Sequence, residues 1–304
     1  MAVDVHPIAA PWGRFALFSF LIDAPELALV DTGVAASAAG VPAELEKLGR
    51  RIEDVRWILL THGHIDHVGG AHALWEATGR QAKVVISQTD AHFLSSRRAH
   101  VEEALALRGD YVDAAALEAE KSAEVLEAIS GEMTPSLTVA DGDALDLGGV
   151  SVRVAAVPGH TPGAVAYVIE GSNDVFIGDA AQGYGAASGF PGFEDPDAYR
   201  ASLQKVLALE PGRLFLGHPY RRVDGSPFPV VLDAAGAREA LEASLAREAE
   251  IRAAITSFQP VETDSRCSPF EQIATELGYG GDPTLEPSPF FTSLHGYRML
   301  KEHS

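Results

Sequence analysis

Cysteine is almost absent from this sequence, because Cys267 is the only one among 304 residues. A single thiol cannot form an intrachain disulfide, and it excludes the clusters of cysteine thiolates that hold many zinc ions. No histidine or aspartate lies near Cys267 in a recognisable arrangement, so we interpret it as a buried or incidental thiol rather than as a nucleophile. A metal site in this chain must therefore be built from nitrogen and oxygen ligands.

Basic residues are also scarce. The chain has 23 Lys and Arg against 43 Asp and Glu, which gives a formal net charge of −20 at pH 7. Binding to a phosphate backbone or to an anionic lipid surface requires a basic patch that replaces the released counterions. We therefore expect neither a nucleic acid nor a membrane as a partner.

Long hydrophobic runs are missing as well. No stretch approaches the roughly 18 apolar residues of a membrane span. The first 14 residues lack the basic stretch and the apolar segment that mark a secretory signal. We expect a soluble cytoplasmic protein.

The apolar content that is present suffices for one large core. Hydrophobic residues make up 46% of the chain, and 304 residues are long for one domain but short for two. No internal repeat and no low-complexity linker separates two independent parts. We predict a catalytic domain over residues 1–232 and a helical C-terminal extension over residues 233–304.

The first half of the chain predicts strands that alternate with helices. Two apolar runs within residues 15–31, separated by a polar turn, predict a β-hairpin. The further elements that we expect are helices at 42–48 and 71–77 and strands at 56–61 and 83–87. Residues 90–131 are rich in Ala, Leu and Glu and lack strand signals, so we predict a helical insertion there.

The second half predicts another sheet and more helices. Strands with Gly and Asp turns between them are expected at 136–140, 144–147, 149–157, 164–170 and 173–179, followed by a helix at 197–209 and a strand at 213–217. A helical pattern covers residues 233–258. A further helix is predicted to start at Ser268, with Pro269 in its first position and Glu271 in its third.

One short segment concentrates possible metal ligands. Residues 61–67, THGHIDH, place three imidazoles and one carboxylate directly after an apolar strand. Nitrogen and oxygen donors of this kind suit borderline metal ions such as zinc. Burying such a run in a protein core would cost free energy, because each buried imidazole or carboxylate needs a partner. The segment therefore indicates a metal site.

Three later segments repeat this arrangement, in which a strand ends and a His or Asp follows beside glycine. They are residues 158–163 (PGHTPG), 177–179 (IGD) and 216–219 (LGHP). Taken one by one these motifs carry little information, but their order along the chain is specific. In this order, from about Phe15 to about His218, the chain resembles the metallo-β-lactamase superfamily, and within it the metallo-hydrolases similar to glyoxalase II and to lactonases.

The resemblance implies an α/β fold, a four-layer αββα sandwich with the metals at the edge where the two sheets open. It places His62, His64 and His160 on a first metal ion. It places Asp66, His67 and His218 on a second ion, and it gives Asp179 the position between the two. We thus expect two divalent metal ions, with zinc as the first choice and iron or manganese as alternatives.

Asp31 lies in a separate motif, the LVDTG turn at residues 29–33. An Asp-Thr-Gly turn also marks aspartic proteases, but those enzymes need two such carboxylates facing each other and this chain has one copy. Asp31 is instead a candidate partner for a ligand histidine, which commonly donates its second ring nitrogen to a carboxylate.

The resemblance implies an enzyme but does not fix its substrate, because the superfamily uses one ligand set for many reactions. An aspartate at position 179 disfavours β-lactam hydrolysis, and the acidity of the chain disfavours RNA processing. We do not find the cluster of basic and tyrosine residues that binds glutathione in glyoxalase II. The expected reaction is therefore cleavage of an ester, lactone or thioester in a small acyl substrate by a hydroxide that bridges the metals and that Asp66 orients.

Two alternatives stay open at this point. An iron-dependent persulfide dioxygenase would resemble the same motif order with one metal ion. A non-catalytic metal-binding protein could keep the fold without turnover, although such proteins usually lose ligands. Metal content and oxygen uptake separate these cases from a hydrolase with two metals.

Several segments outside the ligand motifs are candidates for contact with substrate. Tyr220, two residues after His218, could donate a hydrogen bond to the developing oxyanion. Residues 182–194 combine glycines with three aromatic residues, as a substrate loop or an ordinary packed loop would. The apolar face of the last helix, with Phe290 and Phe291, could cover the site or form a homodimer contact.

Overall fold

The structure is a computed structural model that describes residues 3–13, 15–108, 110–186, 189–256, 258–284 and 288–302. Within these residues the strands form two sheets of six strands each. The first sheet consists of β1 (Asp4–Ala9), β2 (Phe18–Asp23), β3 (Leu27–Val30), β4 (Val55–Leu59), β5 (Lys83–Ser87) and β6 (Leu137–Val139), in this order. The second sheet consists of β12 (Val231–Asp233), β11 (Arg213–Leu216), β10 (Asp174–Gly178), β9 (Val165–Ile169), β8 (Ser151–Ala156) and β7 (Ala144–Asp146), in this order.

Strand direction within each sheet follows from the connections. In the first sheet β1, β2 and β3 are antiparallel, whereas β3 to β6 run parallel and are joined through helices. In the second sheet only β10 and β11 pair in parallel, with α8 (Pro196–Ala208) between them in the chain. Parallel neighbours need such a crossover, which also brings their carboxyl ends to the same edge of the sheet.

The two sheets face each other across a shared hydrophobic core that contains several aromatic rings. Phe176 and Phe215 of the second sheet stack with their ring centroids 4.4 Å apart. Phe20 of the first sheet meets Phe215 edge to face at 5.3 Å. All three rings are at most 2% exposed, so this layer fixes how the sheets lie on each other.

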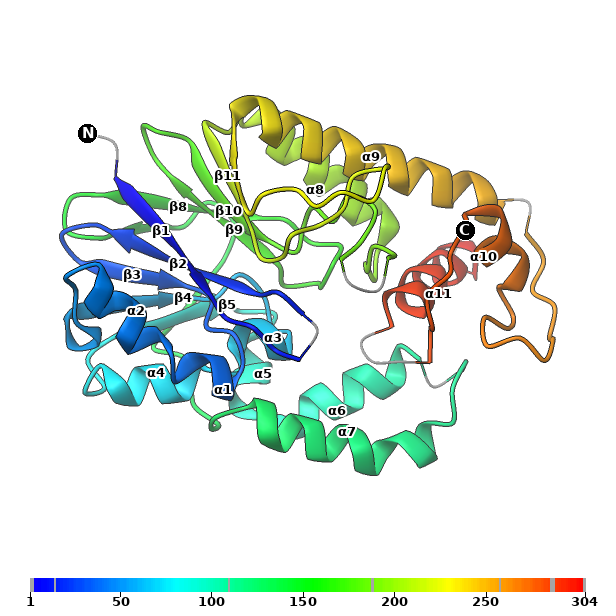
Figure 1. Cartoon of the computed structure of the whole chain (residues 1–304), viewed down its shortest axis with the longest axis horizontal. Helices are drawn as coiled ribbons and strands as arrows, with labels where there is room; N and C mark the ends of the chain where they lie inside the picture. The colour runs from blue at the N-terminus through cyan, green and yellow to red at the C-terminus, as the bar shows by residue number, and fades with distance from the viewer. Residues whose placement is uncertain are drawn as a thin grey trace.

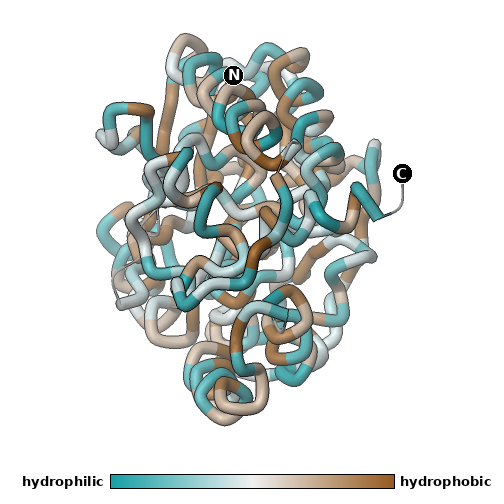
Figure 2. The backbone as a smooth tube through the Cα atoms, turned by 90° about the vertical axis from the view of Figure 1, so that its right-hand side faces the viewer, coloured by the Kyte–Doolittle hydropathy of each residue, from teal (hydrophilic) through white to brown (hydrophobic). Residues whose placement is uncertain are grey.

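Helices cover the outer face of each sheet (Figure 1). Those that share a core with the first sheet are α1 (Ala35–Ala38), α2 (Val41–Lys47), α3 (Ile65–Val68), α4 (Ala71–Ala77), α5 (Ala91–Ser95), α6 (Arg97–Ala106) and α7 (Ala114–Ala128), and a 3₁₀ helix, η1 (Ile52–Asp54), precedes β4. Those that share a core with the second sheet are α8, α9 (Ala234–Thr256), α10 (Glu271–Glu276) and α11 (Pro289–Glu302). Figure 2 shows hydrophobic and hydrophilic residues alternating along the helical turns that face the viewer, as expected when one face of a helix is buried. The predicted α/β sandwich of four layers, αββα, is therefore confirmed.

Capping residues set the helix boundaries in the predicted insertion and in α8. Ser96 accepts a hydrogen bond from the backbone of Ala99 at the start of α6, and Asp113 accepts one from Ala116 at the start of α7. Asp195 caps α8 in the same way, and Pro196 occupies its first position. The helical insertion predicted at 90–131 thus consists of α5, α6 and α7, with Gly109 outside the described residues.

The C-terminal helices are integrated into the sandwich. Ala237, Leu241 and Ile251 of α9 lie in the same core as Val175 and Leu214 of the second sheet. The predicted boundary between residues 232 and 233 stays a proposal, since both sides of it contribute to one core. Among the described residues no helix is long and apolar enough to cross a membrane.

Three details of the sequence prediction were wrong. The strand at 136–140 was expected in the second sheet, but β6 pairs with β5 in the first. β1 and β12 were not predicted, and Pro7 within β1 is tolerated because this strand lies at a sheet edge. The helix expected from Ser268 begins at Glu271, because the Ser268 hydroxyl bonds Thr263 N and Glu262 Oε2 instead.

Candidate metal centre

The four ligand segments meet at one edge of the sandwich. The segment 61–67 follows β4 of the first sheet, while His160, Asp179 and His218 follow β8, β10 and β11 of the second. Their side chains approach one another although they are up to about 150 residues apart in the chain. A site built at the ends of packed strands is held by rigid elements on both sides.

All seven predicted ligands come together. Among the described residues, four groups of side chains have donor atoms within 4.8 Å of one another. Three of them consist of predicted ligands alone, namely His62 with His64 and His160, His62 with His67 and Asp179, and Asp66 with His67 and His218; the fourth is His64 with Glu103 and Glu194. The first and third groups are the ligand sets expected for a first and a second metal ion. The geometry is therefore compatible with two ions, one beside each set.

Asp179 lies between the two sets. Its Oδ1 is 3.4 Å from His67 Nε2, and its Oδ2 is 3.6 Å from His160 Nε2 and 3.3 Å from His218 Nε2. Gly217 makes room for this arrangement, because a Cβ there would come within 2.7 Å of both Asp179 Oδ1 and His67 Cε1. A carboxylate in this position can bridge two cations.

Asp31 contacts the ring nitrogen of His67 that faces away from the cluster of ligands. Its carboxylate lies 2.9 Å from His67 Nδ1 and also accepts hydrogen bonds from the backbone and the hydroxyl of Thr61. The expected contact between Asp31 and a ligand histidine is confirmed. It leaves His67 Nε2 pointing to the cluster with the electron pair that a metal ion needs.

Several buried atoms of the cluster have no hydrogen-bond partner within the described part of the chain. They are Nε2 of His62, His67 and His160 and Oδ1 of Asp179. Buried polar atoms without partners cost free energy, and a native fold rarely leaves so many of them in one place. Metal ions would satisfy all four, so the residues present fit the group that the motifs imply.

The pKa values in the cluster point the same way. Burial, then the neighbouring histidines, hold the pKa of His62 well below 6.5, and burial lowers that of His160 to about 3. Burial opposes the charge on His67 and His218 too, but Asp179 and Asp66 outweigh it and raise the pKa of His218 to about 10 and that of His67 well above 6.5. In the first set His62 and His160 are therefore neutral imidazoles, whereas burial of His64 is outweighed by the hydrogen bond and charge of Glu103, which raise its pKa above 6.5. The second set demands positive charge, either protons or a metal ion.

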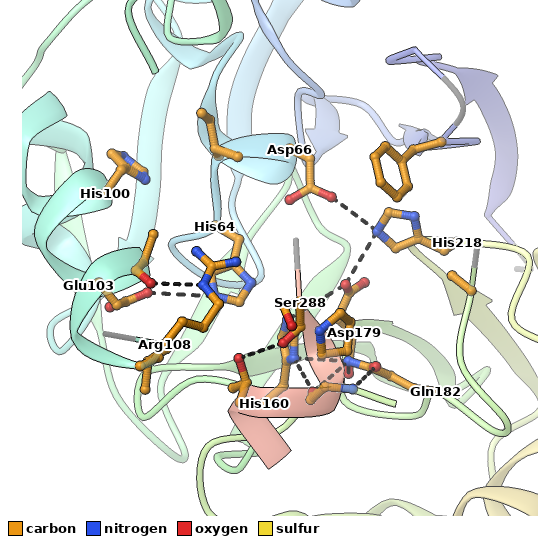
Figure 3. Close-up of a pocket in the computed structure, with 18 of the residues that line it drawn as sticks. His64, Asp66, His100, Glu103, Arg108, His160, Asp179, Gln182, His218 and Ser288 are labelled. Carbon is orange, nitrogen blue, oxygen red and sulfur yellow. Dashed lines mark hydrogen bonds and ion pairs between the residues drawn. The ribbon is translucent and has the colours of Figure 1, made fainter. Parts of the chain in front are cut away.

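A cavity of about 160 Å³ opens beside these ligands (Figure 3). Asp66, Asp179 and His218 face each other at its inner end. Its further walls come from the N-terminal segment, α6, α7, the 182–194 segment and the start of α11, and include Trp12, Phe15, Glu103, Leu107, Arg108, Lys121, Glu124, Phe190, Pro289 and Thr292. The cavity thus combines an apolar lining with a few charged groups.

The structure adds site residues that the sequence analysis missed. Glu103 of α6 lies beside His64, with 3.6 Å between Glu103 Oε1 and His64 Nε2 (Figure 3). Asp90, just after β5, accepts hydrogen bonds from both ligand loops of the first set. Glu103 is one of many glutamates in the helical insertion, whereas Asp90 follows a strand as the ligands do, which was a usable signal.

Gln182 ties the glycine-rich segment to a ligand. Its side-chain amide accepts a hydrogen bond from Gly192 N at 2.6 Å and donates one to Gly192 O at 2.9 Å. Gly192 O in turn lies 2.6 Å from His160 Nδ1. These contacts fix the orientation of the His160 ring, so that its Nε2 faces Asp179.

The segment 182–194 matches both interpretations weighed from the sequence. Phe190 lines the cavity but is only 1% exposed, and Phe193 is fully buried in the core of the second sheet. Tyr184 instead donates a hydrogen bond to Glu250 near the surface. Residues 187 and 188 of this segment lie outside the described residues.

Tyr220 lies at the inner end of the cavity. Its ring centroid is 5.5 Å from that of His218, and its hydroxyl is buried without a hydrogen-bond partner among the described residues. Burial, and after it the charge of Asp179, raises the pKa of Tyr220 well above 10. The hydroxyl therefore stays protonated and can donate a hydrogen bond.

The apolar face of the last helix is occupied within the chain. Phe290, Phe291, Leu294 and Tyr297 are at most 4% exposed and lie in the core of the second sheet. Pro289 and Thr292, on the same helix, line the cavity. The apolar face itself therefore neither covers the site nor is free for a homodimer contact, and the helix reaches the cavity through Pro289 and Thr292 instead.

Comparisons with known proteins agree with this geometry. The family model of the metallo-beta-lactamase superfamily matches residues 12–218. A hydroxyacylglutathione hydrolase of Ruegeria pomeroyi is 31% identical over 298 residues, or 94% of each chain. A probable metallo-hydrolase of Burkholderia pseudomallei is 31% identical over 198 residues, which are 61% of this chain and 58% of that protein.

Solved structures show the same fold. A metallo-beta-lactamase family protein of Thermus thermophilus has a TM-score of 0.69 at 24% identity, and 99% of this chain and 94% of that chain are covered. A B3 metallo-beta-lactamase with an active-site glutamic acid has a TM-score of 0.58 at 25% identity, over 82% of this chain and 88% of that chain. On its sequence, its fold and its ligand geometry together, this chain belongs to the metallo-β-lactamase superfamily.

Proposed function

We propose that this protein is a metal-dependent hydrolase that binds two divalent ions and cleaves an acyl bond of the ester, lactone or thioester type. The observation that carries the proposal is the complete set of seven ligands, with Asp179 between the two groups. His62, His64 and His160 would hold the first ion, and Asp66, His67 and His218 the second. Zinc is the proposed metal, since each zinc ion in a protein is commonly bound by a few His and Asp side chains.

Bound divalent ions would polarise the carbonyl of the substrate and lower the pKa of a coordinated water toward neutrality. The chain itself positions the reactants. Asp66 reaches the cavity with 20% of its side chain exposed, so its carboxylate can hold a water by a hydrogen bond and orient it toward a substrate carbon. Tyr220 can donate its proton in a hydrogen bond to the oxygen that becomes negative.

The lining of the cavity supports a small acyl substrate. Trp12, Phe15, Leu107 and Phe190 offer apolar surface for an acyl chain next to the ligands. The net charge of −20 disfavours a nucleic acid as a substrate. We propose a cytoplasmic enzyme without a membrane partner.

Among the three bond types a thioester is the first to test. The relative that covers 94% of this chain is named as a hydrolase of hydroxyacylglutathione, an acyl thioester. At 31% identity, this relative supports a thioester as the bond that is cleaved, but it gives less support for a particular acyl group or a particular thiol. The sequence also lacks the recognisable glutathione cluster, so another thiol carrier is part of the proposal.

Elemental analysis and a substrate panel test the proposal together. Protein loaded with zinc, iron or manganese is assayed with acyl thioesters, lactones and aryl esters. We expect about two ions per chain and hydrolysis of at least one acyl class that a chelator abolishes. One iron per chain with oxygen uptake on a persulfide would instead establish a dioxygenase. Two ions without turnover on any class would indicate a non-catalytic metal-binding protein.

A further inference from the structure

Asp90 lies behind the candidate metal centre, between the two loops that carry the ligands of the first ion. Its Oδ2 accepts a hydrogen bond from Gly63 N at 2.8 Å and another from the Thr161 hydroxyl at 2.9 Å. Gly63 separates His62 from His64 in the chain, and Thr161 directly follows His160. One oxygen atom of Asp90 therefore connects the two loops that approach from opposite sheets.

The surroundings hold the Asp90 carboxylate in place. Its backbone N–H donates to the Ser87 hydroxyl at 3.2 Å, so the residue is fixed to the end of β5. Its Oδ1 is buried without a hydrogen-bond partner in the described part of the chain and faces Gly163, where a Cβ would collide with it. Asp90 as a whole is only 1% exposed.

Such a carboxylate is expensive to bury. The cost of removing it from water is several kcal/mol, and two hydrogen bonds to a single oxygen recover only part of it. A general contribution to folding does not explain the residue, because an apolar side chain would fill the same space at lower cost. What an apolar side chain cannot do is accept a hydrogen bond from each of the two loops at once.

We infer that Asp90 is a positioning residue that sets the spacing of the two loops and thereby the distances among the donor atoms of His62, His64 and His160. The inference rests on the proposed metal-binding function. It concerns the first ion, because the two donors to Asp90 are next to His62, His64 and His160 in the chain. In the described part of the chain Asp90 makes no hydrogen bond to His67 or His218, and the His67 ring is held by Asp31 instead. A metal site tolerates small displacements of its ligands poorly, and loss of such supporting hydrogen bonds commonly weakens metal binding by about 10- to 100-fold.

The test measures metal affinity directly in the full-length protein. Zinc dissociation constants are determined by competition with a chromophoric chelator for the wild type, Asp90→Ala and Asp90→Asn. We expect Asp90→Ala to weaken one of two ions by about 10- to 100-fold and to leave the other unchanged. Asp90→Asn retains an oxygen that can accept both hydrogen bonds, so it should restore nearly wild-type affinity.

Cobalt substitution adds a readout of geometry. The visible spectrum of bound Co(II) depends on the arrangement of its ligands. With two Co(II) ions bound, Asp90→Ala should change the spectrum of one ion and leave the spectrum of the other unchanged. Thr161→Val removes one of the two donors without changing the size of the side chain, so it should give a smaller change of the same kind.

Asp141 provides the matched control. Its Oδ1 also accepts two hydrogen bonds from separate segments, from Ala156 N at 2.7 Å and from Lys205 Nζ at 2.7 Å, but it touches no ligand loop and is exposed. Asp141→Ala should leave both dissociation constants and the cobalt spectrum as in the wild type.

The possible outcomes separate this inference from the proposed function. A wild type that binds no metal would refute the proposed function itself. Equal affinities of wild type and Asp90→Ala, or an equal loss at both sites, would overturn the role of Asp90 while leaving two-metal binding intact. If Asp90→Ala does not fold, Thr161→Val tests the inference in its place. Zinc dissociation constants and a cobalt spectrum equal to those of the wild type in Thr161→Val would count against the inference.

Discussion

Asp66 differs in exposure from the other carboxylate of the candidate metal centre. Its side chain is 20% exposed and lines the cavity, whereas that of Asp179 is 8% exposed and lies between the two ligand sets. Asp66 Oδ2 is 3.3 Å from His218 Nε2, so it belongs to the second set. The residue is thus placed for two tasks, binding one ion and orienting a water.

Asp66→Asn separates these tasks from the fold, because it keeps the size of the side chain and removes its charge. We expect the second ion to be weakened, the first to remain, and turnover to fall by about two orders of magnitude or more. Metal content, thermal stability and turnover are measured on the same preparation. Asp54→Asn, the same change at an exposed site on η1, should alter none of them. Turnover near that of the wild type with both ions bound would show that Asp66 has neither task.

Tyr220 and Tyr167 offer a second matched pair. Both are buried, but the Tyr167 hydroxyl donates to Leu60 O at 2.9 Å and the Tyr220 hydroxyl has no partner in the described part of the chain. A buried hydroxyl without a partner costs about 1–3 kcal/mol, which a fold retains when the group has another use.

Tyr220→Phe should therefore lower turnover by about 100-fold, comparable to the loss of one oxyanion donor, while the melting temperature stays the same or rises. Tyr167→Phe should lower the melting temperature and change turnover much less, because it removes a satisfied hydrogen bond and Tyr167 does not line the cavity. Turnover and thermal melting of the two variants are compared. If Tyr220→Phe is fully active, the hydroxyl has no role in the reaction.

Individual site residues were predictable from the sequence where they combined an unusual residue type with a strand end. The seven ligands satisfy both conditions, and the geometry brings all of them together. Asp90 and Gln182 act through hydrogen bonds to backbone groups of Gly63 and Gly192, and no residue pattern encodes such a contact. Gln182 could therefore not be recognised before the loops were placed relative to each other, whereas the position of Asp90 after a strand was a partial signal.

At the scale of elements, the helical insertion and the last helix are joined across the cavity. Tyr111, between α6 and α7, has its hydroxyl 2.8 Å from His295 Nδ1 and accepts a hydrogen bond from Arg298 at 3.0 Å. Its ring stacks on Phe291 with 5.0 Å between centroids. Both elements contribute walls of the cavity, so this contact holds two walls at a fixed distance.

Tyr111→Phe keeps the ring stacking and removes both hydrogen bonds. We expect KM to rise by several-fold to tenfold, which corresponds to a loss of about 1 kcal/mol in the free energy of substrate binding, because the cavity walls are held less firmly. The value of kcat should stay nearly unchanged, because the variant does not alter the metal ligands. Steady-state kinetics on the substrate found in the panel check this. Tyr184→Phe is the control, since it removes a hydroxyl bonded to Glu250 away from the cavity. A lower melting temperature without a change in KM would mean that the contact is structural only.

The sequence predicted most elements because their patterns are local. Helix α4 and strand β5 were expected at the residues where they occur, since α4 lies between glycines and β5 is a short apolar run of β-branched residues. The sheet that β6 joins could not be predicted. A strand of only three residues carries little pairing information of its own, and the path of the preceding helices determines which sheet it reaches. β12 is equally short, and its pairing with β11 depends on α9 lying against the second sheet.

The whole molecule is strongly acidic, whereas the charge of its cavity depends on bound metal ions. The cavity lining combines Arg108 and Lys121 with four carboxylates, those of Asp66, Glu103, Glu124 and Asp179. Two divalent ions would add four positive charges, so the loaded cavity would be positive inside a chain of net charge −20. The long-range field therefore repels an anionic substrate, whereas the short-range field inside the cavity favours one. Burial lowers the pKa of Arg108 to about 10, which still leaves it charged at neutral pH.

Ionic strength distinguishes the two fields, because salt screens distant surface charges more than buried ones. Raising it from about 0.01 M to 0.15 M shortens the screening length from about 30 Å to about 8 Å. For an active acyl thioester, kcat/KM should therefore increase with salt when the thiol carries carboxylates and stay constant when the thiol is neutral. The two thioesters share one acyl group and are measured in the same buffers. A decrease with salt for the anionic thioester would show that the cations of the cavity, and not the acidic surface, control the approach of the substrate.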